Sequence, residues 1–155
     1  MNEAFMREAI ALSIEKMKAG EGGPFGAVVV KNDQIVGRGW NCVTTANDPT
    51  AHAEVMAIRD ACGNLDTFDL TGCELYASCE PCPMCLSAIY WAHIDKLYYA
   101  ARREDAAAAG FDDELIYTEV SNPWKNRTLP AEQIMHAEAQ KAFDAWNEKE
   151  NRTAY

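Results

Sequence analysis

Hydrophobic and polar residues follow a helical spacing at the start of the chain. Within residues 2–19, apolar side chains recur three or four positions apart, and charged residues lie between them. The apolar positions of this repeat are Met6, Ile10, Ile14 and Met17. This spacing predicts an amphipathic helix, and the glycine- and proline-rich residues 20–24 predict its end.

A strand-like pattern follows this helix. Two short apolar runs, residues 26–31 and 34–40, are separated only by Asn32 and Asp33. Apolar runs joined by two turn-forming residues predict a β-hairpin. The polar residues 41–50 predict a loop that leads out of the hairpin.

The middle of the chain alternates helical and strand-like segments. Residues 51–62 predict a helix, and we expect Asp48 or Thr50 to cap it, with Pro49 near its first turn. The next segments predict a strand, a helix and a strand, at residues 73–78, 83–93 and 94–101. The resulting order β-β-α-β-α-β predicts a mixed sheet with helices on its faces, an α/β fold.

The C-terminal third has a weaker pattern. A turn is expected at Gly110, a loop at 121–130 and an amphipathic helix at 131–152. The candidate packing positions of that helix are Ile134, Ala137, Ala142 and Trp146. The sequence has neither a repeat nor a linker, so residues 1–155 are predicted to form a single domain.

Composition limits the partners and the compartment. The chain has a formal net charge of −10 and a pI near 4.7, which disfavours nucleic acid because such binding depends on cationic side chains. It has neither a signal-peptide pattern nor an apolar stretch of about 18–20 residues. We therefore expect a cytoplasmic protein without a membrane partner, and a reducing compartment in which clustered cysteines bind metal or act in catalysis.

Three of the six cysteines, Cys79, Cys82 and Cys85, lie within seven residues. A disulfide framework, a redox CxxC motif and part of a metal site are the possible interpretations. Cys82 and Cys85 are nearly one helical turn apart, which directs both sulfurs to one ion, and His52 offers a third ligand at another predicted helix start. Three protein ligands leave one position for water, as in catalytic zinc sites. We predict one Zn²⁺ per chain, with Cys79 as a non-ligand because a fourth protein ligand would close the site.

Glu54 stands two residues after His52. A carboxylate beside zinc-activated water takes the proton of that water and passes it to a leaving group. The order H-x-E…P-C-x-x-C is the signature of zinc-dependent deaminases. A zinc-stabilised interaction module without catalysis is an alternative that would keep the cysteines but would not need Glu54. Cys62 and Cys73 are predicted to be small core residues.

The likeness extends beyond this signature. The segments GGPFGAVVVK, WNCVTTANDPTAHAEVMAIR, LYASCEPCPMCLSAIYWA and AAAAGFDDELIY resemble the bacterial guanine deaminases of the cytidine deaminase-like superfamily, over nearly the whole chain. The resemblance implies a three-layer α/β/α sandwich with a five-stranded mixed sheet. It also implies hydrolysis of guanine to xanthine and ammonia in purine catabolism or salvage, by a homodimer.

The resemblance also implies roles for residues outside the metal motif. Asn41 is suited to the purine edge because an amide offers both a donor and an acceptor, and a loop-turn residue is the alternative. Phe25 and Trp91 are candidate apolar walls for a flat base. Core packing is the alternative for both aromatic residues.

Two further residues are candidates through the resemblance. Asp113 matches an aspartate that faces the guanine amino group and helps to protonate the leaving ammonia. The sequence alone does not choose between Asp112 and Asp113, and a solvated acidic turn is the alternative. The terminal Tyr155 matches a residue that reaches the partner subunit's active site through an exchanged C-terminal segment.

Related activities share the zinc motif. Guanosine deamination is the nearest alternative, because the same base can be bound with or without its ribose. Cytosine and nucleoside deaminases are further alternatives. The tRNA adenosine deaminases also fit the segments NDPTAHAE and EPCPMC, but they need a cationic surface for the anticodon stem, which a chain of net charge −10 is not expected to provide.

Overall fold

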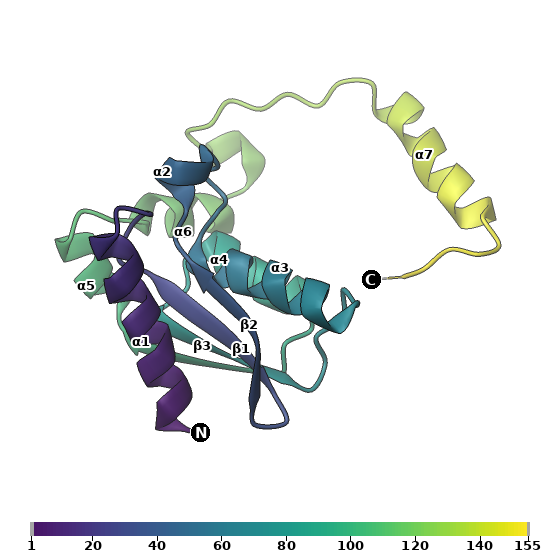
Figure 1. The fold of residues 1–155 in the computed structure, drawn as a ribbon. Helices are drawn as coiled ribbons and strands as arrows, with labels where there is room; N and C mark the ends of the chain where they lie inside the picture. Colours follow the sequence, from purple (N-terminus) through teal and green to yellow (C-terminus); the bar gives the residue numbers. More distant parts are fainter. Residues whose placement is uncertain (1, 155) are drawn as a thin grey trace. The chain divides into compact units, whose positions relative to one another are not determined.

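A mixed β-sheet with helices on both faces forms the part of the molecule that carries the predicted site (Figure 1). The computed structural model describes residues 2–154 and divides into two units, a first unit ending at Glu114 and a second beginning at Leu115. The elements of the first unit are α1 (Glu3–Lys18), β1 (Gly26–Lys31), β2 (Gln34–Trp40), α2 (Val43–Ala46), α3 (Ala53–Leu65), β3 (Cys73–Cys79), α4 (Pro83–Trp91), β4 (Lys96–Ala101) and α5 (Arg103–Ala108).

The sheet has the strand order β2-β1-β3-β4. β1 pairs antiparallel with β2 and β3, and β4 runs parallel to β3. Asn32 and Asp33 both have positive φ angles, 50° and 58°, the conformation that a tight hairpin turn requires. The predicted hairpin and the order of strands and helices are therefore confirmed.

The expected five-stranded sheet is wrong for the residues that the structure describes, since the sheet has four strands. The pattern of the sequence predicted only these four, and the fifth came with the family resemblance. After β4 the chain enters α5, whose sequence REDAAA is rich in alanine. Alanine favours helix and is depleted in strands, so no strand continues the sheet there.

Helices cover both faces of the sheet, and the α/β/α layering is confirmed. On one face, Leu12 of α1 packs on the strand residues Val28, Val30 and Tyr76. On the other face, α3 and α4 pack on the sheet (Figure 1). The buried helix residues of this second face are Ala53, Ala57, Ala61 and Ile89.

Close packing fixes α3 against β2. A Cβ atom added to Gly39 would lie 2.1 Å from the Ala53 carbonyl oxygen, and one added to Gly37 would lie 2.5 Å from that of Ala57. Both glycines therefore let the helix backbone approach the strand. The start of α3, where His52 and Glu54 lie, is set by this contact.

The buried face of α1 differs from its most apolar positions. Ala9, Leu12 and Ser13 are buried, whereas Ile10, Ile14 and Met17 are 36%, 44% and 41% exposed. A Cβ atom on Gly26 would lie 2.3 Å from the Ala9 carbonyl oxygen. Because α1 lies this close to β1, small side chains occupy the contact.

The predicted cap of α3 is wrong. His52 is the residue that precedes the helix, and it makes no side-chain capping hydrogen bond. The Asp48 carboxylate instead accepts hydrogen bonds from the Thr50 backbone N–H at 2.8 Å and the Thr50 hydroxyl at 2.7 Å. Both residues therefore stabilise the turn before the helix. The expected loop also contains the short helix α2, Val43–Ala46.

The second unit is helical in the structure. It contains most of α6 (Glu114–Ser121), the 3₁₀ helix η1 (Trp124–Asn126) and α7 (His136–Glu148). The predicted terminal helix forms, but it begins five residues later than expected and has no buried residue. Ile134 precedes it and is 71% exposed. Among residues 2–154, no helix has the length and apolar character that crossing a membrane requires.

Candidate zinc and catalytic site

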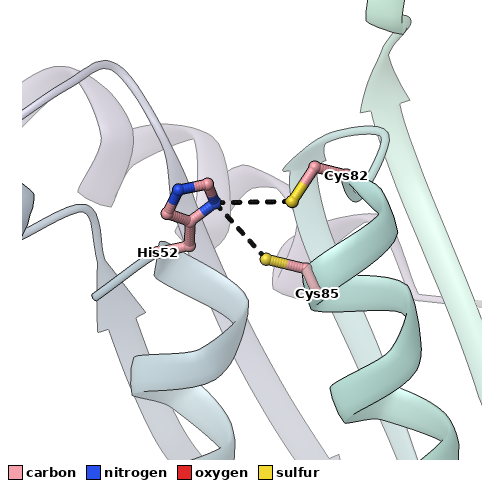
Figure 2. Close-up of side chains that lie close together, drawn as sticks. All are labelled: His52, Cys82 and Cys85. Atoms are coloured by element: carbon pink, nitrogen blue, oxygen red, sulfur yellow. Dashed lines mark hydrogen bonds between the residues drawn. The ribbon is translucent and has the colours of Figure 1, made fainter. Parts of the chain in front are cut away.

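The three predicted metal ligands come from the starts of two helices. His52 precedes α3, Cys82 precedes α4, and Cys85 lies in the first turn of α4. Pro83 occupies the first turn of α4, where its missing N–H costs no helical hydrogen bond. Figure 2 shows the imidazole ring pointing toward both sulfur atoms.

The geometry of this cluster fits a zinc ion. His52 Nδ1 lies 3.6 Å from the Sγ of Cys82 and 3.5 Å from the Sγ of Cys85, and all three ligand atoms lie within 4.8 Å of one another. A tetrahedral zinc with bonds of about 2.0–2.1 Å to nitrogen and about 2.3 Å to sulfur holds such atoms about 3.6 Å apart. One imidazole and two thiolates are also the ligand types that zinc prefers.

Cys79 lies outside this cluster. Its thiol donates a hydrogen bond to the Arg102 carbonyl oxygen at 3.6 Å, and burial raises its pKa to about 11. This neutral, buried thiol agrees with the prediction that Cys79 is not a ligand. Of the two predicted core cysteines, Cys73 is fully buried in the hydrophobic core, and Cys62 is half-buried and packs against that core.

The ligand residues share protons in the metal-free chain. The hydrogen bond from the Cys85 thiol lowers the pKa of Cys82 to about 4, with a further contribution from His52. The same hydrogen bond, together with burial, raises the pKa of Cys85. The hydrogen bond to Cys82 raises the pKa of His52. Cys82 is therefore a thiolate at neutral pH, the form that binds metal.

Glu54 lies in the first turn of α3 and is only 7% exposed. Burial is the largest cause that raises the pKa of its carboxyl, and the negative charge of Cys82 adds to this effect. A carboxyl group with a raised pKa beside a metal site is suited to accept and return a proton near neutral pH. The structure thus brings Glu54 to the three ligands, as the motif predicts.

A cavity of about 440 Å³ adjoins His52, and Asn41 and Phe111 line it. Asn41 is 8% exposed, and its Oδ1 accepts hydrogen bonds from the backbone N–H groups of Gly23, at 3.1 Å, and Val43, at 3.3 Å. Hydrogen bonds within the chain therefore already occupy the oxygen that was predicted to contact a purine. The amide NH₂ is the group that Asn41 can present to a ligand.

The aromatic residues are distributed differently from the prediction. Phe25 packs against the core and lies outside the lining of this cavity. Its ring contacts Phe111 edge-to-face, with 5.0 Å between centroids. Phe111 lines the cavity, and sequence reasoning missed it, although a large aromatic residue directly after the turn predicted at Gly110 is a usable signal.

Trp91 is a predicted site residue that the structure does not bring to the cavity. Trp91 ends α4, is 65% exposed and is absent from the cavity lining. In the single chain it is therefore neither a wall of this cavity nor a core residue. Tyr155 lies outside the described residues.

The neighbouring aspartates have different environments. The exposed Asp112 accepts a hydrogen bond from the Glu114 backbone N–H at 3.0 Å, which stabilises the start of α6. Asp113 is half-buried, and burial followed by the negative charge of Cys82 raises its pKa. The carboxyl of Asp113 is therefore close enough to Cys82 for the charge of this metal ligand to affect its pKa.

Comparison with known proteins places this site in a family. Residues 1–101 match the family model of the cytidine and deoxycytidylate deaminase zinc-binding region. The chain therefore belongs to this family of zinc-dependent deaminases, which confirms the predicted class and its zinc.

Within the family, the chain is similar to guanine deaminase from Bacillus subtilis strain 168, with 52% identity over 154 residues and 99% of each chain covered. The solved structure of guanine deaminase from Bacillus subtilis superposes with a TM-score of 0.97 over 100% of this chain and 99% of that chain. The resemblance to bacterial guanine deaminases is thereby confirmed, and it includes the second unit.

Other relatives match over a shorter range. The solved guanine deaminase from Nitrosomonas europaea is 37% identical, with a TM-score of 0.69, and covers 74% of this chain and 66% of its own. The tRNA-specific adenosine deaminase from Aquifex aeolicus is 41% identical over 99 residues, or 64% of this chain and 65% of its own. The shared metal region therefore does not by itself select the substrate.

Proposed function

We propose that this protein hydrolyses guanine to xanthine and ammonia. The observation that carries the proposal is the cluster of His52, Cys82 and Cys85 beside the buried Glu54, in a chain similar over its whole length to a guanine deaminase. In the reaction, water adds to the purine carbon that bears the amino group. The bond from this carbon to the amino nitrogen then breaks and ammonia leaves.

The residues of the site divide this work among them. Zinc bound to the three ligands supplies an activated water. Glu54 accepts one proton of the attacking water and delivers it to the ring nitrogen, and then transfers the proton of the newly formed hydroxyl group to the leaving amine. The Asn41 amide donates a hydrogen bond to an acceptor on the purine, while Phe111 forms an apolar wall of the cavity. Asp113 faces the amino group that leaves.

A panel of substrates tests this proposal. Ammonia release should be measured from guanine, guanosine, adenine, cytosine, cytidine and a tRNA anticodon stem-loop. We expect guanine to react fastest and the stem-loop to be inert, because a chain of net charge −10 repels the phosphate backbone. If guanosine reacted and guanine did not, the proposed substrate would be wrong and the protein would be a guanosine deaminase. A matched Glu54→Gln preparation sets the background and should release ammonia from guanine at least roughly 100-fold more slowly than wild type.

We also propose that the single functional domain is completed in a cytoplasmic homodimer, in which the C-terminal segment is exchanged and Tyr155 enters the partner's site. Exposed apolar residues of the second unit support this arrangement, since a large exposed apolar surface is typical of an interface. Ile134, Met135 and Phe143 are 71%, 65% and 69% exposed. The partner subunit would cover them.

Mixing two inactive variants tests the exchange. Chains with Glu54→Gln lack the proton acceptor, and chains that end before Tyr155 lack the proposed tail contact. A mixed dimer contains one complete site, so we expect about half of the wild-type activity per purified mixed dimer. Each variant alone should remain inactive. Mixed dimers without any recovered activity would contradict the exchange.

A further inference from the structure

We infer that Arg103 is a positioning residue that ties the loop carrying Asp113 to the loop carrying the zinc ligands. The inference rests on the proposed function in naming Asp113 as part of the site. Arg103 begins α5, and one residue separates it from the end of β4. Its backbone and its side chain contact two different loops. One loop leads into Cys82, and the other carries Phe111, which lines a cavity together with His52.

The backbone of Arg103 is anchored to the ligand loop. Its N–H donates a hydrogen bond to the Glu80 carboxylate at 3.3 Å, and Glu80 stands two residues before Cys82. The Glu80 N–H in turn donates to the Ala101 carbonyl oxygen at 2.9 Å. The Cys79 thiol donates to the Arg102 carbonyl oxygen. Three hydrogen bonds thus hold the start of α5 against the residues that lead into Cys82.

The side chain of Arg103 is anchored to the other loop. Its guanidinium forms an ion pair with the Glu114 carboxylate and lies 3.9 Å from that of Glu104. The side chains of Arg103 and Glu114 are 31% and 61% exposed, so only the arginine end of the pair is partly removed from water. Glu114 directly follows Asp113, and its position therefore restrains that carboxyl.

The beginning of the Asp113 loop is held separately. The N–H of Gly110 donates to the Ala107 carbonyl oxygen at 3.0 Å, and that of Phe111 donates to the Ala106 oxygen at 2.9 Å. These bonds fix the first residues of the loop on α5. Arg103 supplies the corresponding restraint at the far end, so Asp113 lies between two fixed points.

Loss of the ion pair between Arg103 and Glu114 should lower the rate of the reaction more than the stability of the fold. A displacement of about 1 Å of a catalytic group costs on the order of 100-fold in rate. We expect Arg103→Met, which keeps an unbranched apolar chain, to lower kcat/KM for guanine by roughly 10- to 100-fold. Arg103→Lys should recover part of this loss, because it restores the charge without the planar fork.

A double-mutant cycle with Asp113→Asn tests the route of the effect. If Arg103 acts through Asp113, Arg103→Met should cost less than about 3-fold in the Asp113→Asn background, since coupled residues are non-additive. Zinc content should stay at the wild-type level. Arg7→Met, which removes an exposed ion pair to Glu3, is the matched control and should leave activity unchanged.

Hydrogen exchange of the same variants provides a readout that does not depend on the substrate. Peptides covering residues 111–114 should exchange faster in Arg103→Met than in wild type, whereas peptides of α3 should not change. Wild-type activity of Arg103→Met, an equal loss in both backgrounds, or unchanged exchange at 111–114 would each overturn the inference. Failure of wild-type protein to deaminate guanine would instead contradict the proposed function, and the cycle would then use the panel substrate that reacts.

Discussion

Replacing Glu54 with glutamine should retain zinc and lower guanine turnover by roughly 100- to 10,000-fold, the usual contribution of a positioned acid or base. Glutamine has nearly the shape of glutamate but cannot accept the proton of the attacking water. The three metal ligands remain, so metal analysis should still find one zinc per chain. Steady-state ammonia release measures the activity, and Glu15→Gln, an exposed position of α1, provides the matched control.

The same substitution lowers activity but should raise the stability of the zinc-free protein toward unfolding. Burial raises the pKa of Glu54 in the folded chain above its pKa in the unfolded chain. The free energy of unfolding of the wild-type protein therefore falls as the pH rises from the unfolded-state pKa toward the folded-state pKa, because the folded chain must then bury a charged carboxylate. Glu54→Gln should therefore make the zinc-free protein harder to unfold with urea near neutral pH, and this gain should vanish near pH 4. Near-normal turnover of Glu54→Gln, or a stability gain that persists at pH 4, would contradict the role of a buried proton acceptor.

Local spacing predicted the metal cluster well because it depends little on the rest of the fold. Cys82 and Cys85 are one helical turn apart in any helix that begins at Pro83. His52 meets these cysteines because a second helix begins at the same end of the sheet. The order of strands and helices, which is also a local pattern, predicted that helix. The four strands and the zinc ligands were therefore accessible from the sequence.

Long-range packing determined what spacing did not predict. The Asn41 oxygen is engaged because the end of β2 returns to the glycine turn at Gly23, and no local pattern records that contact. Phe111 reaches the cavity from a loop far along the chain. The buried face of α1 follows from its close approach to Gly26, which favours small residues over the larger apolar ones that define its period.

Removing zinc with a chelator should abolish guanine deamination and lower the thermal unfolding midpoint by roughly 10 °C. A ligand at 1,000 times its Kd stabilises a fold by about 4 kcal/mol, and each kcal/mol moves the midpoint by about 2–4 °C in a chain of this size. Thermal unfolding followed by circular dichroism, with and without chelator, measures the shift. Zinc added back should restore both properties, whereas Mg²⁺ should restore neither because thiolates select soft or borderline metals.

Alkylation of the zinc-free chain tests the ligands without any assay of activity. The hydrogen bond from Cys85 lowers the pKa of Cys82 to about 4, so the removal of zinc should leave a reactive thiolate at this half-buried position. A brief treatment with iodoacetamide near neutral pH, followed by peptide mass spectrometry, should modify Cys82 first. Cys62 is also half-buried, but burial raises its pKa, which makes it the matched slow control. Equal labelling of Cys82 with and without zinc would contradict its role as a ligand, because a bound metal protects the sulfur that it coordinates.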